Sequence, residues 1–149
     1  MSLPAEFVPG FVIESPSKTL TDAHFLFFSG LTGDVHPIHY DCEYAKRAGA
    51  DRPLAHGLLL AAMTAFGATA VSQQTHGLVF VEQGSRFIKP CYVGDTIRPR
   101  LTVEQIWQEG KRKFVRLCTQ VINQRGEVVL AGFHVYQLQK SSAREVPHG

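Results

Sequence analysis

The sequence predicts an α+β protein in which about five antiparallel strands wrap around one long apolar helix. Three observations lead to this fold class. Helix signals occupy the first half of the chain, whereas after Gly77 the apolar residues follow the shorter period of strands. An apolar segment at about residues 56–73 is long enough to be the helix that the sheet covers. The length of 149 residues fits one domain, which excludes a large multidomain enzyme with its own nucleotide domain.

Two short helices are expected before the apolar segment. The first covers residues 23–28 and is ended by Gly30 and Gly33. The second covers residues 43–47 and follows Asp41, whose side chain is suited to cap a helix N-terminus. The chain between these helices is therefore an irregular loop, held at both ends by regular structure.

The apolar segment at residues 56–73 is predicted to form the central helix. At 1.5 Å per residue it would be a rod about 27 Å long. Apolar side chains fall on nearly every face, so we expect it to be buried all round. Its longest apolar stretch, residues 57–71, is shorter than the roughly 20 residues of a membrane span, so no membrane association is expected.

The second half reads as long antiparallel strands rich in β-branched and aromatic residues. Residues 109–111 and 124–126 have the Gly-containing composition of hairpin connections. Pairing of an exposed sheet edge with a second copy of the chain is one solution to the edges that such a sheet leaves. The expected strands are 78–81, 86–89, 96–107, 113–123 and 127–139.

Composition places the chain among soluble globular proteins. Hydrophobic residues make up 44% and charged residues 19% of the sequence. The N-terminus has neither a basic start nor an apolar run, so no secretory signal is expected. The 3 cysteines are too few and too scattered for a disulfide framework or a zinc site of cysteines. We therefore expect a reduced, cytoplasmic protein.

The net charge of +2 hides an asymmetry along the chain. Residues 86–116 hold eight basic residues against three acidic ones, a net charge of +5, which leaves −3 for the rest. A basic surface of this kind suits a phosphorylated small molecule or a nucleic acid. Solvated strand faces are the alternative explanation.

Ionisable residues concentrate between Gly33 and Gly57. Asp34 and His39 lie five residues apart in a loop, where they can converge on one water molecule. The carboxylate would orient the water or accept its proton, and the imidazole exchanges protons near neutral pH. The alternative for Asp34 is a turn or capping residue.

The same segment also allows a metal site. His36, His39 and His56, completed by Asp34, are residue types that bind zinc. No helix fixes the spacing of the first two histidines, which weakens this hypothesis. The other histidines follow no ligand spacing and are expected at the surface or in packing: His24, His76 and His134.

Gly57 begins the apolar segment, and no capping side chain precedes it. Its first N–H groups therefore lack an obvious partner and are available to an oxyanion; capping by water or a distant side chain is the alternative. The sequence contains no phosphate-binding Gly-rich loop, no nucleophile elbow and no cysteine in a nucleophile's context, so covalent catalysis is not indicated.

Three ordered motifs resemble those of the MaoC-like proteins, which include the (R)-specific enoyl-CoA hydratases. Residues 33–39, Gly-Asp-Val-His-Pro-Ile-His, resemble the family's Gly-Asp-x-Asn-Pro-x-His. Residues 52–57, Arg-Pro-Leu-Ala-His-Gly, resemble its Arg-Pro-x-x-His-Gly at the head of the central helix. Residues 87–95, Phe-Ile-Lys-Pro-Cys-Tyr-Val-Gly-Asp, resemble the family's strand pair at the point where it enters its next turn. The resemblance spans residues 7–139.

The resemblance implies a hotdog fold, with the helix as the filling of a curved sheet, and a single domain over residues 1–140 followed by a polar tail at 141–149. Asp34 and His39 would be the catalytic pair that activates water, and the Gly57 N–H would hold the thioester carbonyl oxygen. The implied reaction is reversible syn addition of water across the trans-2 double bond of an acyl-CoA, with no cofactor and no metal.

The resemblance also suggests binding residues and an assembly. His36, Pro37 and His56 are grouped with Gly57 as oxyanion or substrate-binding residues. Arg86 and Lys89 are candidates for contacts to the phosphates of CoA. The expected partner is an acyl-CoA substrate, not a nucleic acid, and the expected particle is a homodimer or a higher homo-oligomer.

Two residues depart from the family pattern. His36 stands where the family usually has Asn, and Ala65 stands where some (R)-hydratases have Ser. Both changes bear on the shape of the pocket, so the acyl group of the substrate stays open to short, branched or carboxylated chains. The alternatives in function are a hotdog thioesterase, which hydrolyses the thioester, and a non-catalytic acyl-CoA binding protein.

Overall fold

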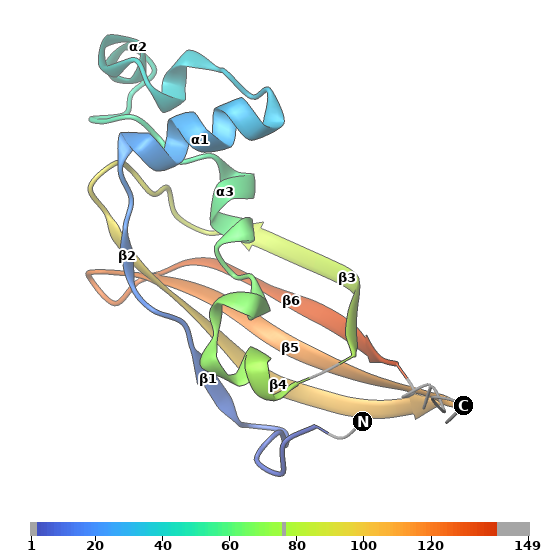
Figure 1. Cartoon of the computed structure of the whole chain (residues 1–149). Coiled ribbons are helices and arrows are strands. Elements are labelled where there is room, and N and C mark those ends of the chain that lie inside the picture. The colour runs from blue at the N-terminus through green and yellow to red at the C-terminus, as the bar shows by residue number, and fades with distance from the viewer. Residues whose placement is uncertain (1–2, 76, 140–149) are drawn as a thin grey trace, which may run out of the picture.

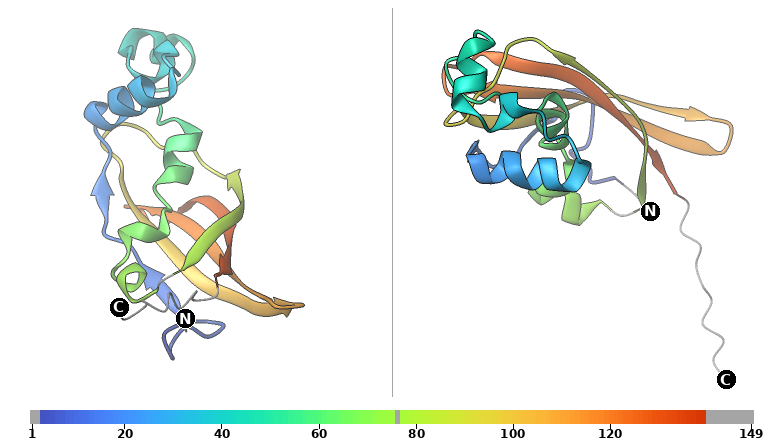
Figure 2. Two further views of the ribbon diagram at one scale, coloured as in Figure 1. Left: turned by 45° about the vertical axis from the view of Figure 1, so that its right-hand side comes forward. Right: turned by 90° about the horizontal axis from the view of Figure 1, so that it is seen from above.

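The structure is a computed structural model that describes residues 3–75 and 77–139 (Figure 1). The predicted tail at 141–149 and His76 lie outside the described residues. The described part has a curved antiparallel sheet with short helices on one side of it (Figure 2). The predicted α+β class is therefore confirmed.

The sheet has six strands in the order β1-β4-β5-β6-β3, with β2 also paired to β4. Every pair is antiparallel. The two predicted hairpins are confirmed, because β4 continues into β5 and β5 into β6 through the expected turns. The strands are β1 (Val12–Glu14), β2 (Lys18–Thr19), β3 (Leu78–Phe87), β4 (Thr96–Glu109), β5 (Arg112–Asn123) and β6 (Val128–Leu138).

Two differences from the predicted strands have local causes. The segments expected at 78–81 and 86–89 form one strand, β3, whose register against β6 shifts between Phe80 and Glu82. That irregularity breaks the alternation of side chains and hides the continuity in the sequence. Strands β1 and β2, three and two residues long, are too short to show a period and were not predicted.

The first two predicted helices are both present, and the first extends beyond the predicted residues 23–28. Helix α1 (Asp22–Thr32) continues through Gly30 and ends at Gly33, whose φ of 79° is the left-handed conformation that glycine favours. Helix α2 (Cys42–Arg47) is capped by the Asp41 side chain, which accepts a hydrogen bond from the Tyr44 N–H at 2.9 Å.

The predicted long central helix is wrong. The segment contains a six-residue helix, α3 (Gly57–Ala62), followed by two 3-10 turns, η2 (Phe66–Ala68) and η3 (Ala70–Gln74). The hydroxyl of Thr64 donates to the Ala61 carbonyl at 2.6 Å, and that of Thr69 donates to the Phe66 carbonyl at 2.8 Å. Such local side-chain bonds to the backbone compete with helical ones and end the helix.

The segment is also not buried all round. Leu59 and Leu60 of α3 are buried against the sheet, whereas Leu58 is 67% exposed. In Figure 1, α3 lies between α1 and the concave side of the sheet. None of the described helices is long and apolar enough to cross a bilayer. The cluster beneath α3 contains Leu20, Phe25, Phe28, Ala55, Leu59, Leu60, Cys91, Ile97, Val121, Val129 and Leu130.

Candidate active site

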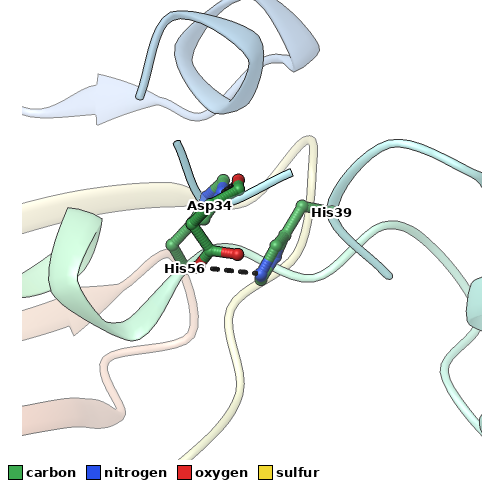
Figure 3. Close-up of side chains that lie close together, drawn as sticks. All are labelled: Asp34, His39 and His56. Carbon is green, nitrogen blue, oxygen red and sulfur yellow. Dashed lines mark hydrogen bonds and ion pairs between the residues drawn. The ribbon is translucent and has the colours of Figure 1, made fainter. Parts of the chain in front are cut away.

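The loop between α1 and α2 brings Asp34 and His39 to the start of α3. A single 3-10 turn, η1 (Pro37–His39), shapes this loop. The Leu54 N–H donates to the Ile38 carbonyl at 3.0 Å, which ties the loop to the chain just before α3. Asp34 and His39 of this loop therefore meet His56, which belongs to a separate segment of the chain (Figure 3).

His39 is held in one tautomer by the backbone. Its side chain is buried, and its Nδ1 lies 2.5 Å from the carbonyl oxygen of Leu54. A carbonyl oxygen only accepts hydrogen bonds, so Nδ1 carries the proton. In the neutral ring, Nε2 is then unprotonated, and this atom is the one that faces Asp34.

The Asp34 carboxylate is open to solvent beside this nitrogen. Its side chain is 50% exposed, and its Oδ2 lies 3.9 Å from the Nε2 of His39. This distance is too long for a direct hydrogen bond, but one water oxygen can lie about 2.8 Å from both atoms. The Asp34 loop is fixed by the Thr32 hydroxyl, which accepts from the Asp34 N–H at 3.2 Å. The pair is therefore arranged to hold one water molecule.

His56 contacts both members of the pair on their buried side. Only 2% of the residue is exposed, and its ring stacks on that of His39. Its Nε2 lies 3.3 Å from the Asp34 carbonyl oxygen and 3.0 Å from the Ser29 hydroxyl, so Nε2 carries a proton. Burial and the neighbouring His39 lower the pKa of His56. With the proton on Nε2, the Nδ1 of His56 is an acceptor, and it is buried without a hydrogen-bond partner among the described residues.

The same three residues test the metal hypothesis. Candidate ligand atoms of Asp34, His39 and His56 all lie within 4.8 Å of one another. However, the Nε2 of His56 is bonded to the Asp34 carbonyl and Ser29, and its Nδ1 is buried. The described residues thus leave one carboxylate and one ring nitrogen free for a ligand, fewer than the three or four protein ligands that zinc takes. His36 is not part of this group.

Gly57 begins α3 beside the pair. Its N–H has no hydrogen-bond partner among the residues that the structure describes, and no side chain caps the helix. A Cβ at this position would lie 3.2 Å from the Phe87 ring, so glycine permits the close approach of β3. A pocket of about 250 Å³ opens here, and it is lined by Leu54, Ala55, Gly57, Leu60, Phe87, Ile88, Lys89, Pro90 and Cys91.

His36 and Pro37 shape the loop. Pro37 is the first residue of η1, a position that suits its fixed φ and missing N–H. His36 caps this turn, because its Nδ1 accepts from the Ile38 N–H at 3.4 Å. Its ring is exposed and packs edge-on against Tyr44 of α2. The backbone of His36 contacts both members of the pair: its N–H donates to the Asp34 Oδ1 at 3.4 Å, and its carbonyl accepts from the His39 N–H at 3.2 Å.

The basic stretch is divided among ion pairs. Arg98 and Arg100 both lie beside Glu14 of β1, and Arg116 bonds Glu104. Glu104 is already counted in the net charge of +5, so among these pairs only Glu14 offsets part of the predicted excess. Such ion pairs are typical of solvated strand faces. Of the two candidates for phosphate contacts, Lys89 is bonded to Glu127, whereas Arg86 forms no ion pair within residues 3–75 and 77–139.

Ser29 is a site residue that the sequence did not indicate. It is buried in the last turns of α1, and its hydroxyl contacts the Nε2 of His56, 27 residues away. A serine within a helix gives no functional signal in the sequence, because its hydroxyl usually bonds the local backbone or water. Only the packing of α1 on α3 shows that Ser29 contacts His56.

Comparison with known proteins agrees with this geometry. The family model described as "MaoC like domain" matches residues 7–124. A mitochondrial 3-hydroxyacyl-[acyl-carrier-protein] dehydratase of Solanum lycopersicum is 31% identical over 116 residues, 78% of this chain and 68% of that protein. An (R)-specific enoyl-CoA hydratase of Rhodospirillum rubrum is 30% identical over 118 residues, 79% of each protein.

A solved structure supports the fold directly. The (R)-hydratase of A. caviae involved in PHA biosynthesis superposes with a TM-score of 0.77 at 27% identity, over 89% of this chain and 97% of that one. The expected hotdog architecture is thereby confirmed, with an interrupted helical segment as its filling. The matched region also contains the loop and the helix start that hold Asp34, His39 and Gly57. The chain belongs to the MaoC-like domain family.

Proposed function

We propose that this protein is a hydro-lyase that adds water reversibly across the trans-2 double bond of an enoyl thioester to form a 3-hydroxyacyl thioester. The observation that carries the proposal is the open 3.9 Å gap between the Asp34 carboxylate and the unprotonated Nε2 of His39. The names of the relatives, hydratases of enoyl-CoA and a dehydratase of 3-hydroxyacyl carrier protein, support this reaction class.

The geometry suggests how each group acts. Water bound between the two side chains gives one proton to the Nε2 of His39 while its oxygen forms a bond to C3. The π electrons of the double bond move toward the thioester, and the Gly57 N–H donates to the resulting enolate oxygen. The His39 imidazolium then returns its proton to C2. Asp34 holds the second hydrogen of the water and stabilises the imidazolium, so H and OH add to the same face.

A two-signal assay tests the reaction. A short trans-2-enoyl-CoA and the matching enoyl carrier protein are each incubated with the protein, and the conjugated enone and free thiol are followed together. Loss of the enone without thiol is the expected result. Release of thiol would instead indicate a thioesterase, and saturable binding without reaction would indicate a binding protein.

Variants of the pair test the assigned roles. General acid–base groups contribute about 10²–10⁴-fold, so Asp34→Asn and His39→Gln should each lower kcat by that factor. Asp51→Asn is the matched control, because Asp51 is exposed and lies in the turn before α3. Full hydratase rates in both active-site variants would refute this assignment.

The proposal includes a homodimer formed along the edge of the sheet. Strand β3 pairs only with β6 in the described part, and its other edge is free. The apolar side chains at this edge are 39–51% exposed: Val79, Phe80, Val81, Phe87 and Ile88. Pairing of two β3 edges would bury them. Sedimentation should therefore give twice the chain mass of 16.5 kDa, and Val81→Lys should shift the particle to the monomer.

Other sequence predictions remain part of the proposal. We infer that residues 1–140 form one domain with the tail at 141–149 outside it, which limited proteolysis tests. We infer a cytoplasmic location, which cell fractionation tests.

We assign His36, Pro37 and His56 to shaping the loop and positioning the Asp34–His39 pair, because they lie next to it. Arg86 is assigned to the CoA phosphates, and Lys89 contributes to the same surface beside Gly57.

A further inference from the structure

A second pocket lies farther along the same two elements that flank Gly57. The first pocket lies at the start of α3 and the end of β3. The second has a volume of about 430 Å³ and lies between α3 with the chain that follows it, the middle of β3, and β6. It is lined by Leu58, Ala61, Ala62, Ala65, Phe66, Gly67, Phe80, Gln83, His134 and Tyr136. An acyl chain whose carbonyl oxygen lies at the Gly57 N–H has this pocket available to its far end.

One wall of this pocket is a directed chain of hydrogen bonds. The Thr64 hydroxyl donates its proton to the Ala61 carbonyl at 2.6 Å, so it accepts from the Nε2–H of His134 at 3.1 Å. The Nδ1 of His134 is then unprotonated and accepts from the Tyr136 hydroxyl at 3.3 Å. Thr64, His134 and Tyr136 are all buried. The sequence indicated only a surface or packing role for His134.

The wall is polar but uncharged. Burial lowers the pKa of His134 and raises that of Tyr136 to about 12, so both are neutral near pH 7. The residues that line the pocket include no acid and no Lys or Arg. Phe80 packs edge-on against His134 and at a tilt against Tyr136, with ring centroids 4.9 Å and 5.1 Å away. A carboxylate would therefore enter without a cation to pair with.

Two groups at this wall are available to a ligand. The Oε1 of Gln83 accepts from Ser85 at 3.1 Å, and its NH₂ has no hydrogen-bond partner within the described residues. The hydroxyl of Tyr136 is held by a long bond to His134, so its proton can turn to a better acceptor. Ala65, the departure from Ser noted in the sequence, also lines the pocket and brings no hydroxyl to it.

We propose that this pocket selects an acyl chain that carries an uncharged oxygen, a hydroxyl or a carbonyl, remote from the thioester. The NH₂ of Gln83 donates to that oxygen, and the Tyr136 hydroxyl turns its single proton to it from the Nδ1 of His134. Thr64 and His134 are positioning residues, because their bond keeps the unprotonated Nδ1 of His134 directed at the Tyr136 hydroxyl. A plain alkyl chain would leave the Tyr136 proton on its long bond to His134 and offer no acceptor to the NH₂ of Gln83. This inference rests on the proposed function, because it takes the thioester to lie at Gly57.

Matched substrates test the preference. The rates of hydration of trans-2-hexenoyl-CoA, its 5-oxo and 6-hydroxy derivatives, and the corresponding dicarboxylic enoyl-CoA are compared as kcat/KM. At least one of the two uncharged oxygenated chains should exceed hexenoyl-CoA by about tenfold or more, and the dicarboxylic chain should be the poorest. Equal or better use of the plain chain than of both oxygenated chains would overturn the proposal.

Two variants test whether Gln83 and Tyr136 cause the preference for oxygenated chains. Gln83→Leu and Tyr136→Phe should each bring the ratio of oxygenated to plain substrate toward one. Gln83 is exposed, so its variant tests the proposal even if the buried Tyr136→Phe variant does not fold. Gln105→Leu, at an exposed position of β4 away from both pockets, should keep the ratio. A ratio that survives both pocket variants would refute the assigned donors.

A binding measurement separates this inference from the proposed reaction. Calorimetry compares the saturated thioesters 5-oxohexanoyl-CoA, 6-hydroxyhexanoyl-CoA and hexanoyl-CoA, which cannot be hydrated. Tighter binding of an oxygenated thioester that is lost in Gln83→Leu would support the pocket even if no enoyl-CoA reacts. Hydration of enoyl-CoA without any such preference, in rate or in binding, would leave the reaction standing and refute the pocket.

Discussion

The imidazole rings of His39 and His56 are stacked, with centroids 3.6 Å apart and planes 19° from parallel. Two positive rings at this distance would repel each other strongly. His56 is buried, its pKa is lowered, and its Nε2 proton is bonded to the Asp34 backbone and Ser29. His56 is therefore the neutral ring of the stack, and the free Nε2 of His39 is the nitrogen that is placed to take a proton from water.

Replacement of His56 by Phe keeps a ring for the stack but removes the Nε2 proton. The Ser29 hydroxyl then loses a buried partner and the Asp34 carbonyl loses a donor, so the free energy of unfolding should fall by about 1–3 kcal/mol. The loop that carries Asp34 should also loosen and kcat should fall. Urea unfolding and the hydration assay measure the two effects.

A double-mutant cycle with Ser29→Ala tests whether the bond causes this loss. Removing the hydroxyl together with the His56 ring nitrogen leaves no orphaned serine, so the double variant should be more stable than the sum of the single losses predicts. Strict additivity would show that the Ser29–His56 contact contributes nothing to stability.

Acidification should destabilise the fold through its buried histidines. The pKa values of His56 and His134 are lowered in the folded state, so below the ordinary pKa of about 6.5 the unfolded chain binds more protons. The free energy of unfolding should therefore be highest above that pH and fall as the pH drops from 7.5 to 5. His134→Gln should flatten this dependence, whereas the exposed His36→Gln should not. A stability that rises on acidification in this range would contradict the prediction.

Replacement of glycine by alanine should lower the stability at Gly132 and raise it at Gly30. A Cβ at Gly132 of β6 would lie 2.1 Å from the Gly84 carbonyl oxygen of β3, so Gly132→Ala forces the two backbones apart. We expect it to cost about 1–3 kcal/mol of stability. At Gly30 in α1 a Cβ would meet nothing within 4 Å, so Gly30→Ala should stabilise by about 0.5–1 kcal/mol. Urea midpoints of the two variants should thus move in opposite directions from the unmodified protein.

Arg86 should contribute to recognition of the CoA phosphates. A hydrogen bond to a charged group contributes about 1.5–3 kcal/mol, so Arg86→Gln should raise KM for an enoyl-CoA about tenfold or more. The same enoyl group on pantetheine, which lacks the nucleotide phosphates, should show no change. Arg98→Gln is the control, because Arg98 already lies beside Glu14. An equal rise in KM for both thioesters would remove phosphate contact as the explanation.

The parts of the protein that local chemistry controls were predictable from the sequence. Alternating and β-branched residues indicated β4, β5 and β6, and Gly-containing turns indicated their hairpins. Asp41 and Gly33 marked helix ends by side-chain capping and by a left-handed φ, both of which depend on one or two residues. The spacing of Asp34 and His39 in a loop between helices indicated their convergence.

Only the tertiary structure decided what depends on distant partners. The segment after Gly57 looks like one long helix, but Thr64 bonds both the Ala61 carbonyl and His134, 70 residues away, and the helix stops. The tautomer of His39 depends on the carbonyl of Leu54, and the neutrality of His56 depends on burial beneath α1. Residue types and their spacing determined which groups this protein has for its chemistry; long-range hydrogen bonds and burial decided their protonation and direction, because both depend on neighbours that the chain brings together only when it folds.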